Sequence, residues 1–235
     1  MVESLTNSKT IIWKERFRFL LKISLKTIYF NFKYLPFKQA IHFPIIIAKK
    51  VKLKRLKGKI IIEDIVYFKQ IEIGFNDVGI FDYNYSRTIW DVSGIVIFKG
   101  RARIGHGSKI AVGENGTLVI GKNFTIVSES TIIAFNKISF GDDCLLSWDI
   151  LVMDTDMHEI KNEFGNVINS NKEISIGHHV WIGCRSLILK GSVVPDNCVI
   201  GANSHLFKPL SDSSCVYVGN PSKIAVKNIY WQNNY

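Results

Sequence analysis

Residues 176–211 read IGHHVW, IGCRSL, ILKGSV, VPDNCV, IGANSH and LFKPLS, which are six consecutive blocks of six residues. Each block opens with an aliphatic residue, and the fifth position of the first five blocks holds Val180, Ser186, Ser192, Cys198 and Ser204. A period of six fits neither an amphipathic helix nor simple strand alternation. It predicts a triangular coil in which each block supplies one short strand and one corner, and ~18 residues complete one turn.

The same period occurs earlier in the chain. Aliphatic openers stand at Ile104, Ile110, Ile120, Ile126 and Ile132, and after a two-residue shift the blocks continue from Phe140, Leu146 and Val152. Glycine follows many openers and supplies the corner positions that need a permissive backbone. Between Met157 and Lys172 the period fails, so we expect a loop at 157–172 that leaves the coil. Loops held on a rigid scaffold commonly carry function.

The region before the repeat divides into two parts. Residues 58–100 are rich in β-formers but irregular, and we expect strands that either open the coil or cover its first turn. Residues 9–32 predict one amphipathic helix that ends before Pro36, with an apolar stripe formed by Ile12, Phe17, Leu20, Leu21 and Ile28. The domain organisation is therefore a basic helical region at 1–57, an opening β segment at 58–100 and a coil at 101–235.

The net charge of +10 comes from the N-terminal region, because residues 1–57 contain 14 Lys and Arg against 2 Asp and Glu. This cationic region either lies on an anionic membrane surface or packs on the coil with solvated lysines. No nucleic-acid-binding motif accompanies the charge.

The four cysteines have no CxxC spacing, which favours neither a zinc site nor a disulfide framework and points to a reducing compartment. The N-terminus lacks a leader pattern, and the longest apolar runs fall short of the ~20 residues of a spanning helix. We expect a cytoplasmic protein, with the inner face of the membrane as one place where it acts.

Four stretches resemble the hexapeptide-repeat acyltransferases, in particular the branch that acetylates sugars, capsules and lipopolysaccharide. They are IGHGSKIAVGENG, FGDDCLLSWDILVMDTDMH, ISIGHHVWIGCRSLILKGSVVPDNCVIGANS and VGNPSKI, and they cover about residues 95–226. The resemblance implies a mainly β fold, a left-handed parallel β-helix with an N-terminal helical segment and a short C-terminal helix. It also implies a homotrimer with sites between subunits, acetyl-CoA as cosubstrate, no metal, and a sugar or polysaccharide-precursor acceptor.

The resemblance places the catalytic histidine in the loop before IGHHVWIG, which corresponds to His158. A sugar hydroxyl needs a base to become a good nucleophile at neutral pH, and imidazole suits that role. Asp154 and Asp156 are both candidates to orient the ring. Alternation along a strand would send the two carboxylates to one face, opposite Thr155 and Met157, and leaves the choice between them open.

For coenzyme A, the resemblance implies backbone groups of small residues on the last coils together with a few cations and one aromatic ring. These are Trp181, Gly183, Ser186, Gly201, Ala202, Lys208, Pro221 and Lys223. Trp181 stands where an ordinary block has a small polar residue, so its ring should project outward from the coil. The resemblance implies that this ring packs beside the active-site cleft.

Three alternatives accompany this hypothesis. A β-helical zinc enzyme of the carbonic anhydrase type would use histidines such as His106, His158, His178 and His179. A catalytically silent scaffold would use none of them. A covalent route through Cys184 or Cys198 is disfavoured, because both occupy corner or interior phases of the repeat and neither neighbours a histidine.

Overall fold

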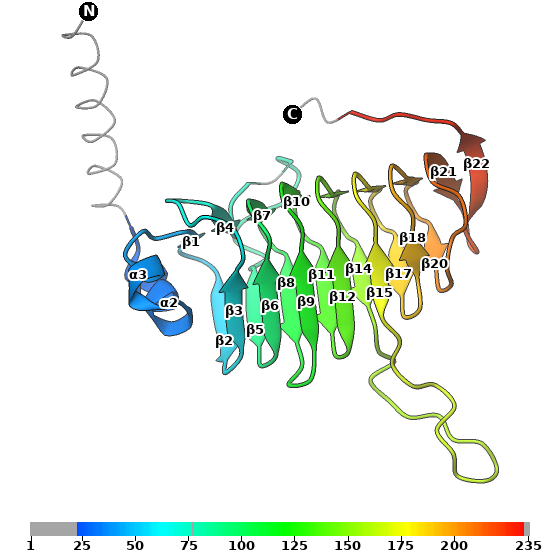
Figure 1. The fold of residues 1–235 in the computed structure, drawn as a ribbon, viewed down its shortest axis with the longest axis horizontal. Helices are drawn as coiled ribbons and strands as arrows, with labels where there is room; N and C mark the ends of the chain where they lie inside the picture. Colours follow the sequence, from blue (N-terminus) through cyan, green and yellow to red (C-terminus); the bar gives the residue numbers. More distant parts are fainter. Residues whose placement is uncertain (1–22, 77, 233–235) are drawn as a thin grey trace, which may run out of the picture.

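The computed structural model describes residues 23–76 and 78–232. Two helices, α2 (Leu25–Tyr34) and α3 (Phe37–Ala40), precede a long coil of short strands. The strands form three sheets, one on each side of the coil, and the coil rises along a single axis from the helices to the C-terminal end (Figure 1). No helix within the described residues is both long enough and apolar enough to cross a membrane.

The three sheets take every third strand in turn, so that each strand pairs in parallel with the strand one coil away. The first sheet contains β1 (Ile45–Ile47), β4 (Ile71–Ile73), β7 (Ala102–Ile104), β10 (Phe124–Ile126), β13 (Leu145–Leu146), β16 (Trp181–Ile182), β19 (Val199–Ile200), β21 (Cys215–Val218) and β22 (Lys223–Lys227). The second contains β2 (Lys52–Leu56), β5 (Ile89–Val92), β8 (Lys109–Val112), β11 (Thr131–Ala134), β14 (Leu151–Met153), β17 (Leu187–Leu189) and β20 (His205–Leu206). The third contains β3 (Lys59–Ile62), β6 (Ile95–Phe98), β9 (Thr117–Ile120), β12 (Lys137–Phe140), β15 (Ile174–Ile176) and β18 (Val193–Val194).

The block openers point into the coil and stack on one another, as the repeat predicts. In the first sheet Ile104 pairs with Ile126, and the series continues through Leu146 to Ile182 and Ile200, each of them fully buried. The small fifth residues of the later blocks are buried too. This aliphatic stack is the main hydrophobic core, and each fully buried Leu or Ile side chain in it contributes about 1.5–3 kcal/mol.

The coil is longer per turn than 18 residues over most of its length. From Ile182 to Ile200 the register gives 200 − 182 = 18 residues, but from Ile104 to Ile126 it gives 126 − 104 = 22. The corners absorb the difference, because the paired strands keep their openers in register. A corner glycine is required where coils approach closely: a Cβ on Gly105 would lie 1.7 Å from the carbonyl oxygen of Val127.

The coil begins at Ile45, well before residue 101 where the repeat placed its start. The strands between residues 45 and 98 pair in the same three sheets as the later ones. The segment at 58–100 is therefore part of the regular coil, although its sequence hides the period because its turns vary in length.

The helical head differs from the predicted single helix. Helix α2 starts at Leu25, because Ser24 has extended backbone angles and its side chain accepts a hydrogen bond from the Thr27 N–H. The predicted stripe residues Ile12, Phe17, Leu20 and Leu21 lie outside the described residues. Asn31 fixes α2 to the first strand, since its side chain both donates to the Ile45 carbonyl and accepts from the Ile45 N–H.

The predicted short C-terminal helix is wrong for the described residues, which end at 232. Cys215–Val218 and Lys223–Lys227 form β21 and β22, joined as an antiparallel pair. The alternating sequence KIAVK suits a strand, and the pairing gives the last coil a partner for its open edge. Beyond β22 the tail runs back along the coil (Figure 1).

Candidate active site

The predicted loop leaves the coil after β14 and returns at β15, at the corner between the second and third sheets (Figure 1). The loop begins at Asp154, three residues earlier than predicted, and Asp154 is fully buried. The carboxylate accepts hydrogen bonds from the backbone N–H groups of Phe135 and Asn136, at 2.7 and 2.9 Å. Burial raises the pKa of Asp154, and these backbone bonds oppose the shift. Asp154 thus joins the loop to the preceding coil.

Asp156 faces solvent, whereas Asp154 is buried, so the prediction that both carboxylates share one face is wrong. The chain leaves the strand after Met153, and the alternation of sides ends there. Asp156 is exposed and accepts hydrogen bonds from Lys190 and from the Asn169 side-chain amide. The hydrogen bond from Lys190 lowers the pKa of the Asp156 carboxyl, which therefore stays ionised at neutral pH.

Asn169 holds the base of the loop closed. Its side-chain N–H₂ donates both to Asp156 and to the His158 carbonyl, each at 2.8 Å, and its oxygen accepts from the Ile160 N–H at 2.7 Å. Lys190, from the coil, also donates to the Asn169 carbonyl at 2.6 Å. The backbone on either side of His158 is thus fixed to the scaffold.

His158 lies at the rim of a cavity of about 380 Å³. Its side chain is exposed, and no hydrogen bond within the described residues joins its ring to Asp154 or Asp156. The cavity is lined by Phe135, Thr155, Met157, His158, Glu159, Val167, Asn169, Ser170 and Asn171. An exposed imidazole on a fixed backbone, beside a cavity, has the geometry of a general base that meets its substrate from solution.

Asn169 and Lys190 were not expected from the sequence. Lys190 lies 34 residues from its carboxylate partner, and only the return of the chain by one coil brings the two together. Asn169 stands in the polar run INSN, where nothing separates an anchoring amide from a solvated one.

Trp181 projects outward from β16, as predicted, and 37% of its surface is exposed. Its indole N–H donates to the Ser147 hydroxyl at 3.1 Å. Trp181 belongs to the first sheet, whereas His158 lies at the corner between the other two, and Trp181 does not line the His158 cavity. The structure does not bring these two predicted residues together in one chain.

The small residues predicted to bind coenzyme A have different environments. Gly183 and Ala202 stack at one corner, where a Cβ on Gly183 would lie 2.6 Å from the Ala202 nitrogen. The N–H groups of Gly183 and Gly201 already donate to the carbonyls of Ile200 and Tyr217. Ser186 is fully buried and donates to the Gly201 carbonyl. Of this set, Ala202 is the exposed one.

The predicted cations lie toward the C-terminal end of the coil. Lys208 and Pro221 line one small cleft together with His205 and Phe207, and the bond between Asn220 and Pro221 is cis. Lys208 and Lys223 are both exposed. The structure therefore brings Lys208 and Pro221 together, apart from the corner of Gly183 and Ala202.

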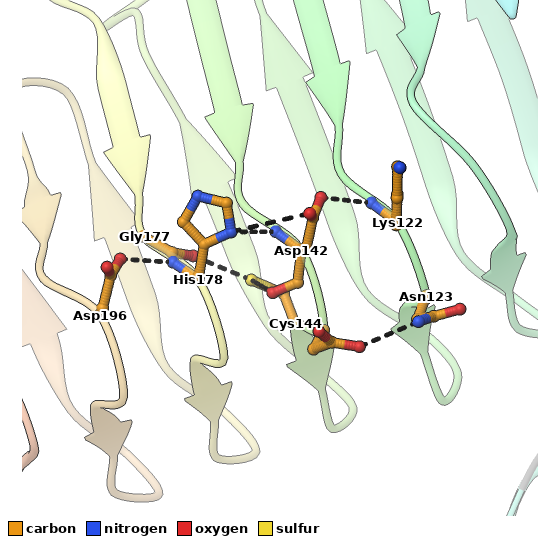
Figure 2. A network of polar contacts seen from close by, with 8 residues as sticks. Lys122, Asn123, Asp142, Cys144, Gly177, His178 and Asp196 are labelled. Carbon is orange, nitrogen blue, oxygen red and sulfur yellow. Dashed lines mark hydrogen bonds and ion pairs between the residues drawn. The ribbon is translucent and has the colours of Figure 1, made fainter. Parts of the chain in front are cut away.

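The other histidines of the zinc alternative lie apart from His158. Figure 2 shows His178 at a corner between the third and first sheets, where its Nδ1 accepts from the Asp142 N–H at 3.0 Å. The His178 N–H in turn donates to Asp196, so the three residues bridge successive coils. His106 is buried and contacts Ser86. The described residues contain no group of three or more His, Cys, Asp or Glu suited to a metal ion.

The four cysteines are free. Burial raises the pKa of Cys144 to about 12 and also raises the pKa of Cys198. Both thiols therefore stay protonated at neutral pH, and a protonated thiol is a poor nucleophile. Only Cys184 is partly exposed.

No family model matches the chain. Over 104 residues it is 43% identical to a polysialic acid O-acetyltransferase of Neisseria meningitidis, which covers 44% of this chain and 48% of that protein. Over 126 residues it is 33% identical to a polysialic acid O-acetyltransferase of Escherichia coli O1:K1 / APEC, which covers 53% of this chain and 38% of that protein. The chain thus spans about half or less of the length of these curated relatives.

A solved structure agrees with these matches. The polySia-specific acetyltransferase NeuO aligns over 81% of this chain and 79% of its own, with 24% sequence identity and a TM-score of 0.50. At this identity the likeness shows the fold alone. The sequence matches agree with the resemblance that the motifs indicated, and the likeness to NeuO confirms the predicted fold, a left-handed parallel β-helix.

Proposed function

We propose that this protein transfers an acetyl group from acetyl-CoA to a hydroxyl of a sugar in a polysaccharide or its precursor. The observation that carries the proposal is His158, an exposed imidazole at the rim of a cavity, on a loop that Asn169 and Lys190 fix to the coil. The O-acetyltransferase names of the two curated relatives support the reaction class.

His158 acts as the general base. Its ring takes the proton of the acceptor hydroxyl while the oxygen attacks the thioester carbonyl, and the carbon–sulfur bond then breaks. The thiol of coenzyme A leaves with a proton returned by the imidazolium, so the histidine ends the cycle neutral. A base positioned in this way contributes about 10²–10⁴ in rate.

We assign different roles to the two aspartates. Asp156 positions His158 through Asn169, which donates to both the Asp156 carboxylate and the His158 carbonyl. Asp154 joins the loop to the coil through the backbone of Phe135 and Asn136 and contacts no substrate.

We place coenzyme A along the last coils, as the resemblance implied. Ala202 and the corner at Gly183 offer a narrow surface without large side chains, and Lys208 and Lys223 supply exposed cations for phosphate. The buried Ser186 hydroxyl is no longer part of this assignment, because it donates inside the coil.

We further propose a homotrimer. His158 and Trp181 lie on different sides of the coil. A site that uses both residues therefore needs the loop of one subunit to lie against the first sheet of the next subunit. Mixed assemblies of His158→Ala and Trp181→Ala chains should then regain activity that neither variant has alone. A monomer in light scattering, or no recovery in the mixture, would contradict this arrangement.

We also propose that the helical head contacts an anionic membrane. Residues 23–62 contain ten Lys or Arg and no Asp or Glu. On the same head Leu25, Tyr29 and Phe37 are 84%, 54% and 70% exposed. Apolar side chains among cations suit a lipid surface.

Vesicle flotation tests this contact. The protein should float with anionic vesicles and not with vesicles of phosphatidylcholine alone, and the double variant Tyr29→Ser/Phe37→Ser should float less. Equal flotation with both kinds of vesicle would contradict the proposal.

The function is tested by thiol release from acetyl-CoA across mono- and oligosaccharide acceptors. We expect acceptor-dependent release that falls about 10²–10⁴-fold in His158→Ala. His42→Ala is the matched control, because His42 is also exposed but lies at the far end of the coil. Equal activity in wild type and His158→Ala would remove His158 from the mechanism.

A further inference from the structure

A second cavity of about 380 Å³ lies on the outer side of the first sheet. It is lined by Arg101, Arg103, Asn123, Phe124, Thr125, Asp143, Cys144, Leu145, His179 and Trp231. It shares no lining residue with the His158 cavity, and none of its lining residues is a predicted catalytic or cofactor-binding residue or has a role in the proposed chemistry. Its volume is at the lower end of the ~300–1,000 Å³ range of ligand pockets.

The C-terminal tail closes one side of this cavity. Trp231 returns to the coil over 52 residues of sequence and donates its indole N–H to the His179 carbonyl at 2.8 Å. Its ring stacks on the His179 imidazole, with centroids 4.3 Å apart and an interplanar angle of 7°. The His179 ring is itself held by Asn197, at 3.1 Å. The indole is thus fixed in place as a wall of the cavity.

The opposite wall carries two guanidinium groups. Arg101 is exposed, and within the described residues its guanidinium group forms no hydrogen bond or ion pair. Arg103 makes an ion pair through Nε with Glu72, at 3.4 Å, and Glu72 is shared with Lys69 at 3.1 Å. Within the described residues the two terminal nitrogens of Arg103 have no hydrogen bond or ion pair, so they are available to a ligand in the cavity that Arg103 lines.

The remaining polar groups of the lining are mostly neutral. The Asn123 side-chain N–H₂ donates to the Asp143 carboxylate at 3.0 Å. This leaves the Asn123 side-chain oxygen and the Thr125 hydroxyl to meet a ligand. Asp143 is the single acidic residue of the lining, against two arginines. The cavity therefore has a net positive charge, with hydroxyl-binding groups beside it.

We infer that this cavity binds a carboxylate-bearing sugar unit of the acceptor. Arg101 and Arg103 hold the carboxylate, since the planar guanidinium fork matches its two oxygens. Trp231 packs against the apolar face of the sugar ring, and Asn123 and Thr125 bond its hydroxyls. The inference rests on the proposed function in one respect, because it names the acceptor as an acidic saccharide.

The test is equilibrium binding by calorimetry without acetyl-CoA, so that it does not depend on catalysis. The probes are an oligosaccharide containing a uronic or sialic acid, the same oligosaccharide reduced at its carboxyl group, and inorganic phosphate. The variants are Arg101→Gln, Arg101→Gln/Arg103→Gln and Trp231→Ala. Arg87→Gln, which removes an exposed arginine just before β5 of the second sheet, is the matched control.

We expect the acidic oligosaccharide to bind at least about tenfold more tightly than its reduced form, and each cavity variant to weaken it by about tenfold, the strength of one charge-assisted interaction. Arg87→Gln should bind it like wild type. Equal affinity of acidic and reduced probes, or unchanged affinity in the double variant, would overturn the inference. Displacement of the acidic probe by equimolar phosphate would overturn it in favour of a phosphate site. If the protein acetylates only neutral sugars and does not bind the acidic probe, the proposed transferase function would hold, but the proposed role of this cavity would be wrong.

Discussion

The coil and the loop at 154–173 are built on opposite principles. In the coil each aliphatic opener is buried and contacts its counterpart one turn away, and backbone hydrogen bonds run along every sheet. In the loop most side chains are exposed, and the shape depends on a few contacts made by Asn169, Asp156 and Lys190. The comparison teaches that stability resides in the repeat and the chemistry in the segment that departs from it, so changes in the two regions should have separable effects.

The largest expected effect is the loss of folding when a charge enters the stack. Ile182→Asp places a carboxylate in a fully buried position between Leu146 and Ile200. Burying an unpaired charge together with the loss of an aliphatic side chain costs more than about 4 kcal/mol. We expect no cooperative unfolding transition in urea, as measured by circular dichroism.

The matched change in the loop is Val167→Asp, at a side chain that is 44% exposed. Surface substitutions of this kind change the free energy of unfolding by less than about 0.5 kcal/mol. A comparable loss of stability at both positions would break the separation between coil and loop.

A smaller effect is expected at Asp154, where the two regions meet. Asp154→Ala leaves the N–H groups of Phe135 and Asn136 without their acceptor. Loss of a buried acceptor costs about 1–3 kcal/mol. The control Glu173→Ala removes an exposed carboxylate, 3.3 Å from Lys137, and should cost less than about 1 kcal/mol. Urea midpoints of the two variants check the difference, and equal midpoints would contradict the role given to Asp154.

The pH dependence at Asp154 follows from the same geometry. Because burial raises its pKa above 3.8, the folded state holds this proton to higher pH than the unfolded chain does. The stabilising contribution is therefore full below pH 3.8 and falls as pH rises through the raised pKa. Asp154→Asn does not titrate, so the stability of wild type relative to this variant should decline over that window. A rise would contradict the sign of the shift.

The repeat predicted the coil well because each inward position depends only on a local block. Ile182, Ile188 and Ile200 are assigned by counting in sixes, and no long-range information is needed. The same counting missed the coil before residue 101, where turn lengths vary, and gave 18 residues for turns that contain 22 in the register of Ile104 with Ile126.

The site was less predictable. His158 and the loop follow from the failure of the period and the resemblance. The anchor between Lys190 and Asp156 depends on chain return over 34 residues, which no local pattern encodes. The cavity beside Trp231 was even harder to predict from the sequence, because its Trp231 wall forms only when the C-terminal tail folds back onto His179.

The smallest expected effect is on the loop anchor, the contact between Lys190 of the coil and Asp156 of the loop. Lys190→Met removes one ion pair from an exposed carboxylate, so the free energy of unfolding should change by at most about 1 kcal/mol. The anchor fixes the backbone of His158, and the same energy expressed in the transition state lowers kcat/KM by up to about fivefold. Lys161→Met is the control, since Lys161 pairs with Glu159 and not with Asp156.

The anchor also has a pH window. The hydrogen bond from Lys190 lowers the pKa of Asp156 below 3.8, so the contribution is present above that value and is lost as pH falls through the lowered pKa. Hydrogen exchange of the Ile160 and Ile168 amides, compared between wild type and Lys190→Met at each pH, measures it. Both amides bond within the loop, to Asn169 and to Ile160. Faster exchange in the variant at pH 7, with a difference that disappears only below pH 3.8, is the expected result. Equal exchange with an unchanged kcat/KM would mean that Asn169 alone fixes His158, and the loop would then hold its catalytic geometry without the coil.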